Sequence, residues 1–229
     1  MVNSKDFCKM YCNGKSIEIP INGVLKKEDL IILKEEKRKI YFSIVGNNPT
    51  NPKVALVGLC PGSSQLGTLI NSYNKKGLSF EKSAQTSGFS KISKNLAKML
   101  RKIGIDSYLK KDISDDFKFN EDADFLTTSL VKCASLSEGK SPSKQFNILK
   151  FDSTKLCFIN RFIEDIKKYD SLKKIIILGK IGEYAVNEKL IDGKSVKQIL
   201  EKMDKEVLFI PHPSGSNNGT IKKFLLDRY

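Results

Sequence analysis

Two loops rich in glycine, proline and serine hold the side chains best suited to chemistry. The loop Gly58–Gln65 follows the apolar run Val54–Val57, and the loop P-H-P-S-G-S-N-N-G (211–219) follows Val207–Ile210. The second loop contains His212, the only histidine in the chain. Glycine lets the backbone approach a ligand, proline stiffens a turn, and a neutral imidazole donates one hydrogen bond. We expect an active site built from these two loops, although a structural role for His212 within the last loop is the alternative.

The elements that position these loops follow from the apolar runs. Four short, mainly apolar runs predict buried strands: Val54–Val57, Phe125–Val131, Lys174–Leu178 and Val207–Ile210. Amphipathic spacing between and after them predicts helices over Lys91–Ile103, Thr154–Tyr169, Ile181–Leu190, Val196–Met203 and Thr220–Tyr229. This alternation predicts an α/β fold, a three-layer α/β/α sandwich with a central four-stranded parallel sheet. The carboxyl ends of its strands are where ligands bind.

The remaining segments carry weaker patterns. Lys26–Tyr41 has apolar residues at loosely helical spacing, and Ser63–Gly88 is polar, which is typical of an ordered active-site loop or lid. Tyr108–Asp124 and Ala134–Asp152 are expected to be connections. We expect one domain over residues 1–229, with residues 1–50 as an N-terminal extension packed on it.

Composition limits the classes of function. The 229 residues are 40% hydrophobic, which suffices for one large core, and no run reaches the 18 apolar residues of a membrane helix. Without an apolar N-terminal signal region, we expect a cytoplasmic protein that is not secreted, and a monomer without a membrane partner. Forty Lys and Arg against 26 Asp and Glu give a net charge of +14, which favours a nucleic-acid partner; compositional drift is the alternative.

Four segments, in order along the chain, resemble the uracil-DNA glycosylase superfamily over about Val54–Leu225. G-L-C-P-G (58–62) is similar to the family's first strand-end motif, and T-T-S-L-V-K-C (127–133) resembles a segment of the iron–sulfur branch. I-I-I-L-G-K-I-G-E-Y-A (175–185) is similar to that branch's strand-Gly-helix segment. H-P-S-G-S-N-N (212–218) resembles the last loop of most branches and of the mismatch-specific branch.

The resemblance implies base excision from DNA. Members extrude a base, hold it in a pocket and hydrolyse its N-glycosidic bond. His212 matches the group that donates to the departing base, which takes up negative charge. The residues that would bind DNA phosphates are Gly62 and Ser63 of the first loop, and Ser214, Gly215, Ser216, Asn217 and Asn218 of the last.

The resemblance also implies a base pocket. G-L-S-F (77–80) is similar to the family segment that supplies a stacking ring, so Phe80 is the first candidate and Tyr73 the second, with ordinary packing as the alternative for both. Ser129 stands where the family has a base-reading Asn. A serine offers one rotating hydroxyl in place of a fixed donor and acceptor pair.

Other positions depart from the family pattern. Leu59 and Cys60 stand where the family has a carboxylate or amide that orients the attacking water. Cys60 as a thiolate, or Gln65 nearby, is the remaining candidate for that role. Ser216 stands where a bulky residue fills the vacated base stack, so we expect single-stranded or mispaired DNA to be preferred.

Five cysteines without a signal peptide argue against a disulfide framework. In the iron–sulfur branch four cysteines bind the cluster, and Cys8, Cys12, Cys133 and Cys157 occupy the corresponding regions. The resemblance therefore implies a [4Fe–4S] cluster, or zinc in its place. Unrelated buried or free thiols would explain the same count.

Three functions are compatible with these patterns. The first is a DNA base-excision glycosylase that hydrolyses the N-glycosidic bond of uracil or another damaged base flipped from DNA. The second is a non-catalytic DNA-binding relative that keeps the fold and pocket but lacks the water-activating residue. The third is an unrelated α/β enzyme that binds nucleotides or phosphate.

Overall fold

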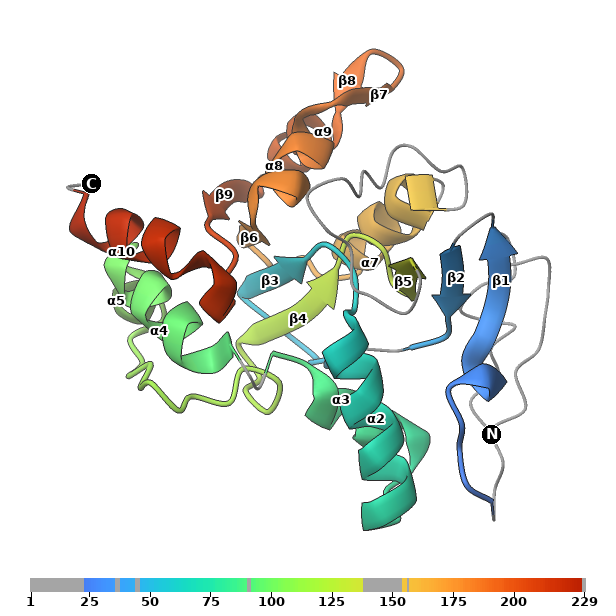
Figure 1. Cartoon of the computed structure of the whole chain (residues 1–229). Helices are drawn as coiled ribbons and strands as arrows, with labels where there is room; N and C mark the ends of the chain where they lie inside the picture. Colours follow the sequence, from blue (N-terminus) through green and yellow to red (C-terminus); the bar gives the residue numbers. More distant parts are fainter. Residues whose placement is uncertain are drawn as a thin grey trace. The chain divides into compact units, whose positions relative to one another are not determined.

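The computed structural model describes residues 23–35, 38–43, 46–89, 92–137, 154–155 and 157–227 (Figure 1). Its contacts divide the chain into two compact units. Unit 1 comprises Met1–Gly46, Cys60–Gly88 and Ser129–Asp165, and unit 2 comprises Asn47–Leu59, Phe89–Thr128 and Ile166–Tyr229. The expectation of one domain with residues 1–50 packed on it stays a prediction. Within the described ranges, no helix has both the length and the apolar character needed to span a bilayer.

A four-stranded parallel sheet contains all four predicted strands, in the order β4-β3-β6-β9. Its strands are β3 (Val54–Gly58), β4 (Phe125–Ser129), β6 (Lys174–Leu178) and β9 (Glu206–Ile210). Leu56 pairs with Ile176, which pairs in turn with Leu208. The side chains from Val54 to Val57 are fully buried, because helices cover both faces of a parallel sheet and leave no place for alternating polar residues.

Helices of unit 2 cover the two faces of this sheet. One core cluster joins the strands to α4 (Ser93–Lys102), α5 (Ile105–Leu109) and α10 (Asn218–Leu226) and includes Leu208 and Ile210. Phe209 points to the opposite face, where Lys197 of α9 (Val196–Lys202) lies 5.5 Å from its ring centroid. The neighbouring α8 (Lys180–Asn187) contacts β6. The predicted three-layer α/β/α fold is therefore confirmed.

A small hairpin separates α8 from α9, although the sequence pattern predicts a helix up to Leu190. The hairpin consists of β7 (Lys189–Ile191) and β8 (Lys194–Ser195). Its turn residues Asp192 and Gly193 have φ values of 47° and 72°, which an Asp-Gly pair adopts readily. The strong turn ends the helix at Asn187, before the apolar pattern ends.

Unit 1 corrects two expectations from the sequence. The described residues between 26 and 41 are not helical beyond the short turn η1 (Glu28–Leu30); they include β1 (Ile31–Glu35) and β2 (Arg38–Tyr41). These strands pair with β5 (Ala134–Ser137) in an antiparallel sheet. One face of this sheet is buried, and β-branched residues such as Ile32 and Ile40 fit that arrangement better than a helix.

The predicted loop over Ser63–Gly88 is instead a pair of helices, α2 (Ser63–Lys76) and α3 (Phe80–Ser87). Leu66 and Leu69 pack in the core of unit 1, and Ser72 and Ser83 are buried beside them. Because serine occupies some of the buried positions, the sequence of these helices lacks the periodic apolar pattern by which a helix is predicted. Unit 1 also contains the π-helical segment η3 (Cys157–Phe162), which leads into α7 (Ile163–Lys167).

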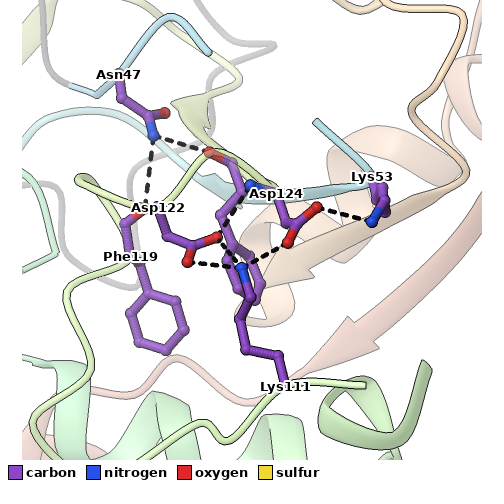
Figure 2. A network of polar contacts seen from close by, with 7 residues as sticks. Asn47, Lys53, Lys111, Phe119, Asp122 and Asp124 are labelled. Carbon is purple, nitrogen blue, oxygen red and sulfur yellow. Dashed lines mark hydrogen bonds and ion pairs between the residues drawn. The ribbon is translucent and has the colours of Figure 1, made fainter. Parts of the chain in front are cut away.

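A charged network holds the amino ends of β3 and β4 (Figure 2). The Lys111 ammonium lies between the carboxylates of Asp122 (2.8 Å) and Asp124, and Lys53 contacts Asp124 at 3.0 Å. The backbone N–H groups of Lys53 and Val54 both donate to the Asp124 carbonyl. The network lies at the start of these strands, at the edge of the sheet opposite to their carboxyl ends.

Candidate functional site

Three strands of the parallel sheet end at one edge, at Gly58 (β3), Leu178 (β6) and Ile210 (β9). His212 follows β9 by two residues and lies in the loop that leads through η4 (Gly215–Asn217) into α10. This is the carboxyl edge, where open α/β sheets bind ligands. The sole histidine is therefore where the sequence predicts it.

The His212 loop is fixed by hydrogen bonds within itself. The backbone N–H of Ser214 donates to His212 Nδ1 at 3.3 Å. Asn217 Nδ2 donates to the His212 carbonyl at 3.2 Å and to Ser214 Oγ at 3.0 Å. These bonds hold the loop in one conformation around the imidazole.

The hydrogen bond from Ser214 determines which ring nitrogen carries the proton of the neutral imidazole. Because Nδ1 accepts a hydrogen bond, a neutral His212 carries its proton on Nε2. Burial lowers the pKa of His212 below its ordinary value of about 6.5, since a charged ring is poorly solvated there. At neutral pH the side chain is therefore an uncharged donor through Nε2. Such a donor can stabilise an oxygen that gains negative charge.

The surface of the same loop suits an anion. Gly215, Ser216 and Asn218 are exposed, and Ser214 Oγ and Ser216 Oγ lie 2.9 Å apart. The nine-residue helix α10 begins at Asn218, and its first N–H groups carry the positive end of the helix dipole. Asn217 is directed inward by its two bonds. The predicted phosphate-binding residues of this loop thus share one short turn before a helix.

From Cys60 onward the first loop belongs to unit 1, and its residues from Ser63 form the start of α2. Gly62 is the N-cap of this helix and Ser63 its first residue, so their N–H groups lie at its N-terminus. Gln65 Oε1 accepts the N–H of Gly62 at 2.9 Å. The Gln65 carboxamide, a candidate for orienting water, therefore caps the helix with its oxygen.

Cys60, the other candidate for water activation, has a protonated thiol. Burial raises the pKa of Cys60 to about 12, although the backbone of Ser135 and the Arg38 guanidinium lower it in part. At pH 7 the thiol is neutral and a poor general base. A thiolate mechanism has no support in this environment.

The predicted base-binding residues also lie in unit 1. The Phe80 side chain is 4% exposed and stacks on Phe42, with ring centroids 5.7 Å apart and planes at 11°. Tyr73 packs half-buried against the same cluster, and Ser129 is buried at the end of β4. Core packing accounts for the position of Phe80, and base contact by these three residues stays a prediction.

Of the four cysteines predicted to bind a cluster, Cys8 and Cys12 lie outside the described residues. Cys133 is buried in the core of unit 1, and Cys157 Sγ accepts the N–H of Lys132 at 3.5 Å. In the described part of the chain, no three His, Cys, Asp or Glu residues are grouped to hold a metal ion. Because two of the four predicted ligands lie outside that part, the cluster stays a prediction.

Two residues of unit 2 contact the His212 loop without having been singled out as site residues in the sequence. Asn95 Nδ2 of α4 donates to the Pro213 carbonyl at 3.0 Å across 118 positions of the chain. Gly179, directly after β6, has a φ of 89° and donates its N–H to the Ile210 carbonyl at 2.8 Å. A glycine at the end of an apolar run was a visible signal, but nothing around Asn95 indicates its long-range contact.

Comparison with known proteins gives one finding. Residues 45–228 match the family model described as the Uracil DNA glycosylase superfamily. The match covers well over half of the chain and includes both loops. No curated protein matches the chain significantly.

Proposed function

Since this chain belongs to the uracil-DNA glycosylase superfamily, whose members act on DNA, we propose that it is a base-excision glycosylase. Its substrate is uracil or another damaged base flipped from DNA. In the reaction the bond between the base and the sugar C1′ breaks, and its electron pair leaves with the base. The oxygen of a water molecule bonds to C1′, and the water gives up a proton to solvent, from which the released base anion takes one up.

The observation that carries this proposal is the Ser214 N–H that donates to His212 Nδ1, since it leaves the proton of a neutral imidazole on Nε2. The departing base becomes an anion, and its negative charge concentrates on a carbonyl oxygen. A neutral Nε2–H donor fixed before the reaction stabilises that charge without reorganisation. The Ser214 N–H on Nδ1 and the burial of the ring both favour this state. The Ser214 hydroxyl and the Gly215 N–H of the same loop are the groups we propose for phosphate contact.

The two leading functions differ in whether a residue of the protein activates the attacking water. Leu59 is apolar, Cys60 carries a neutral thiol, and Gln65 uses its amide oxygen as a helix cap. Stabilisation of the leaving base is therefore the main catalytic contribution in our proposal. The same observation favours a second candidate, a DNA-binding relative that has lost catalysis.

The side chains at the tip of the His212 loop indicate which form of DNA is the preferred substrate. Ser216 is exposed but small, and Asn217 is tied back to His212 and Ser214. Neither side chain is placed to fill the gap that a flipped base leaves in a paired duplex. We therefore propose single-stranded or mispaired DNA as the preferred substrate, because it requires less unstacking and unpairing.

An oligonucleotide panel tests the activity. Wild type and His212→Ala are incubated with single-stranded, mispaired and paired DNA that contains uracil, hypoxanthine, xanthine or mismatched thymine, and abasic sites are then cleaved with alkali. We expect wild type to produce breaks with at least one base, and His212→Ala to lower that rate by about 100- to 1000-fold. If binding persists but no base yields breaks, the enzyme proposal is wrong and the non-catalytic relative is favoured.

A further inference from the structure

Gly179 and His212 approach each other at the carboxyl edge of the sheet in unit 2. The β6–β9 ladder ends with the pair Leu178 and Ile210, and the Gly179 N–H extends it by donating to the Ile210 carbonyl. His212 stands only two residues after Ile210. The ladder therefore fixes the Gly179 backbone beside the segment that carries the histidine.

A side chain at Gly179 would crowd His212. A Cβ atom added to Gly179 would lie 3.1 Å from His212 Cβ and 3.8 Å from both its Cα and its Cδ2. A separation of 3.1 Å is tighter than ordinary contacts, so the histidine would have to move by a few tenths of an ångström. Cδ2 is bonded to Nε2, and a shift of the ring at this edge therefore moves the N–H donor.

We propose that Gly179 is a positioning residue, whose bare Cα sets the orientation of the His212 imidazole. The ring is held on one side by Gly179 and on another by the Ser214 N–H at Nδ1. Together the two contacts fix the tautomer and the direction of Nε2–H. The importance of that direction for base excision rests on the function proposed above.

Backbone strain is a second reason for glycine at this position, and the test must separate it from the contact. Gly179 has a φ of 89°, which L side chains rarely adopt, so any substitution there costs stability. Gly104 and Gly193, also in unit 2, have φ values of 74° and 72° with no atom within 4 Å of an added Cβ. Gly104→Ala and Gly193→Ala also place a side chain at positive φ without touching His212, and serve as controls. Gly179 has a ψ of 154°, in a region essentially restricted to glycine, whereas Gly104 has a ψ of 24° in the αL region, so the strain at Gly179 is larger and a double-variant cycle is needed to separate it from the contact.

The experiment measures the imidazole directly. Because His212 is the only histidine, NMR of the full chain labelled with 15N-histidine reports this ring alone. We expect wild type and both controls to carry the proton on Nε2 at pH 8, with a pKa below about 6.5. In Gly179→Ala we expect a mixture of tautomers, and a pKa shifted toward that of an exposed histidine.

Excision kinetics give the second readout. A misplacement on the order of 1 Å can cost about 100-fold in rate, and a shift of a few tenths of an ångström costs less, so kcat of Gly179→Ala should fall by about 10-fold relative to the controls, with little change in KM. An imidazole spectrum and pKa like those of the controls would overturn the proposal. An inactive wild type would overturn the proposed function instead, and the NMR result would still decide the role of Gly179.

A double-variant cycle covers the case in which Gly179→Ala folds poorly. His212→Gly removes the Cβ atom that the new methyl group meets, so only backbone strain remains. We expect Gly179→Ala to destabilise the His212→Gly protein less than wild type in urea unfolding, or to fold only in that background. Equal loss of stability in both backgrounds, or no rescue of folding, would overturn the proposal.

Discussion

His212 titrates in an environment that favours its neutral form. Its pKa is lowered because the half-buried ring is poorly solvated when charged, and its Nδ1 already accepts the Ser214 N–H. Protonation of Nδ1 would replace this accepted bond with two donors facing each other. One residue thus links the chemistry of the site to the dependence of folding on pH.

This linkage predicts a pH-dependent contribution of His212 to stability. The folded pKa lies below the unfolded value of about 6.5, so the unfolded chain binds more protons on acidification. The contribution is present above pH 6.5 and is lost as pH falls through the folded pKa. We expect the difference in free energy of unfolding between wild type and His212→Gln to decrease from pH 8 to pH 5 in urea titrations. A difference that is constant or larger at pH 5 would contradict the lowered pKa.

At the scale of the elements, α4 and the His212 loop are joined by the bond from Asn95 to the Pro213 carbonyl. We expect Asn95→Ala to cost about 1 kcal/mol of stability, the usual value of such a bond, and to weaken DNA binding because the loop loses an anchor. Urea unfolding and fluorescence anisotropy measure the two effects. Asn187→Ala is the control, since exposed Asn187 bonds only within its helix in the contacts described, to the Glu183 carbonyl. Equal DNA affinity for the two variants would contradict this role of Asn95.

The network at the amino ends of β3 and β4 supports a second prediction about the elements. The hydrogen bond from Lys111 holds the pKa of Asp124 below its ordinary value, so the interaction contributes above pH 4 and is lost as pH falls through the folded pKa. We expect Lys111→Met to cost about 1–3 kcal/mol at pH 7 and less at pH 3.

The control for this network is Lys118→Met, because Lys118 pairs with Glu121 at 3.7 Å on an exposed surface, where ion pairs contribute little. Urea titrations of both variants at the two pH values make the comparison. An equal cost of Lys111→Met at pH 7 and pH 3 would argue against the charged network.

At the scale of the whole molecule, the net charge of +14 predicts strong dependence of DNA binding on salt. Each phosphate neutralised by the protein releases condensed counterion, so log affinity should fall linearly with log salt concentration. Measured at matched salt, affinity should be higher for single-stranded or mispaired DNA than for paired duplex. A DNA affinity that is insensitive to salt would contradict the neutralisation of DNA phosphates by the protein.

Replacing Ser216 by Leu tests the origin of the preference for unpaired DNA. A larger apolar side chain at the loop tip should fill the vacated stack and narrow the difference between paired and unpaired substrates. Ser107→Leu, at an exposed position of α5, is the matched control. If Ser216→Leu behaves like Ser107→Leu, another residue acts as the wedge or the duplex is not opened.

Local sequence patterns were sufficient to predict the strands and helices of much of the molecule. The four buried strands and the helices that follow them are marked by apolar runs and periodic spacing, both properties of neighbouring residues. The bond from Ser214 to His212 spans two positions, so the loop sequence already contains the partners that set the tautomer. By contrast, Lys26–Tyr41 and Ser63–Gly88 were predicted wrongly, because pairing with β5 and the burial of serines override their local pattern.

By itself, the sequence determined the parallel α/β fold, the family resemblance and the loop that carries His212. Only the tertiary structure decided that Gly179 lies against His212, that Asn95 holds Pro213, and that the Cys60 thiol is buried beside Arg38. The physical reason is separation along the chain. A local pattern encodes burial and turns, whereas close contact, loss of solvation and a shifted pKa depend on atoms that folding brings together from distant segments.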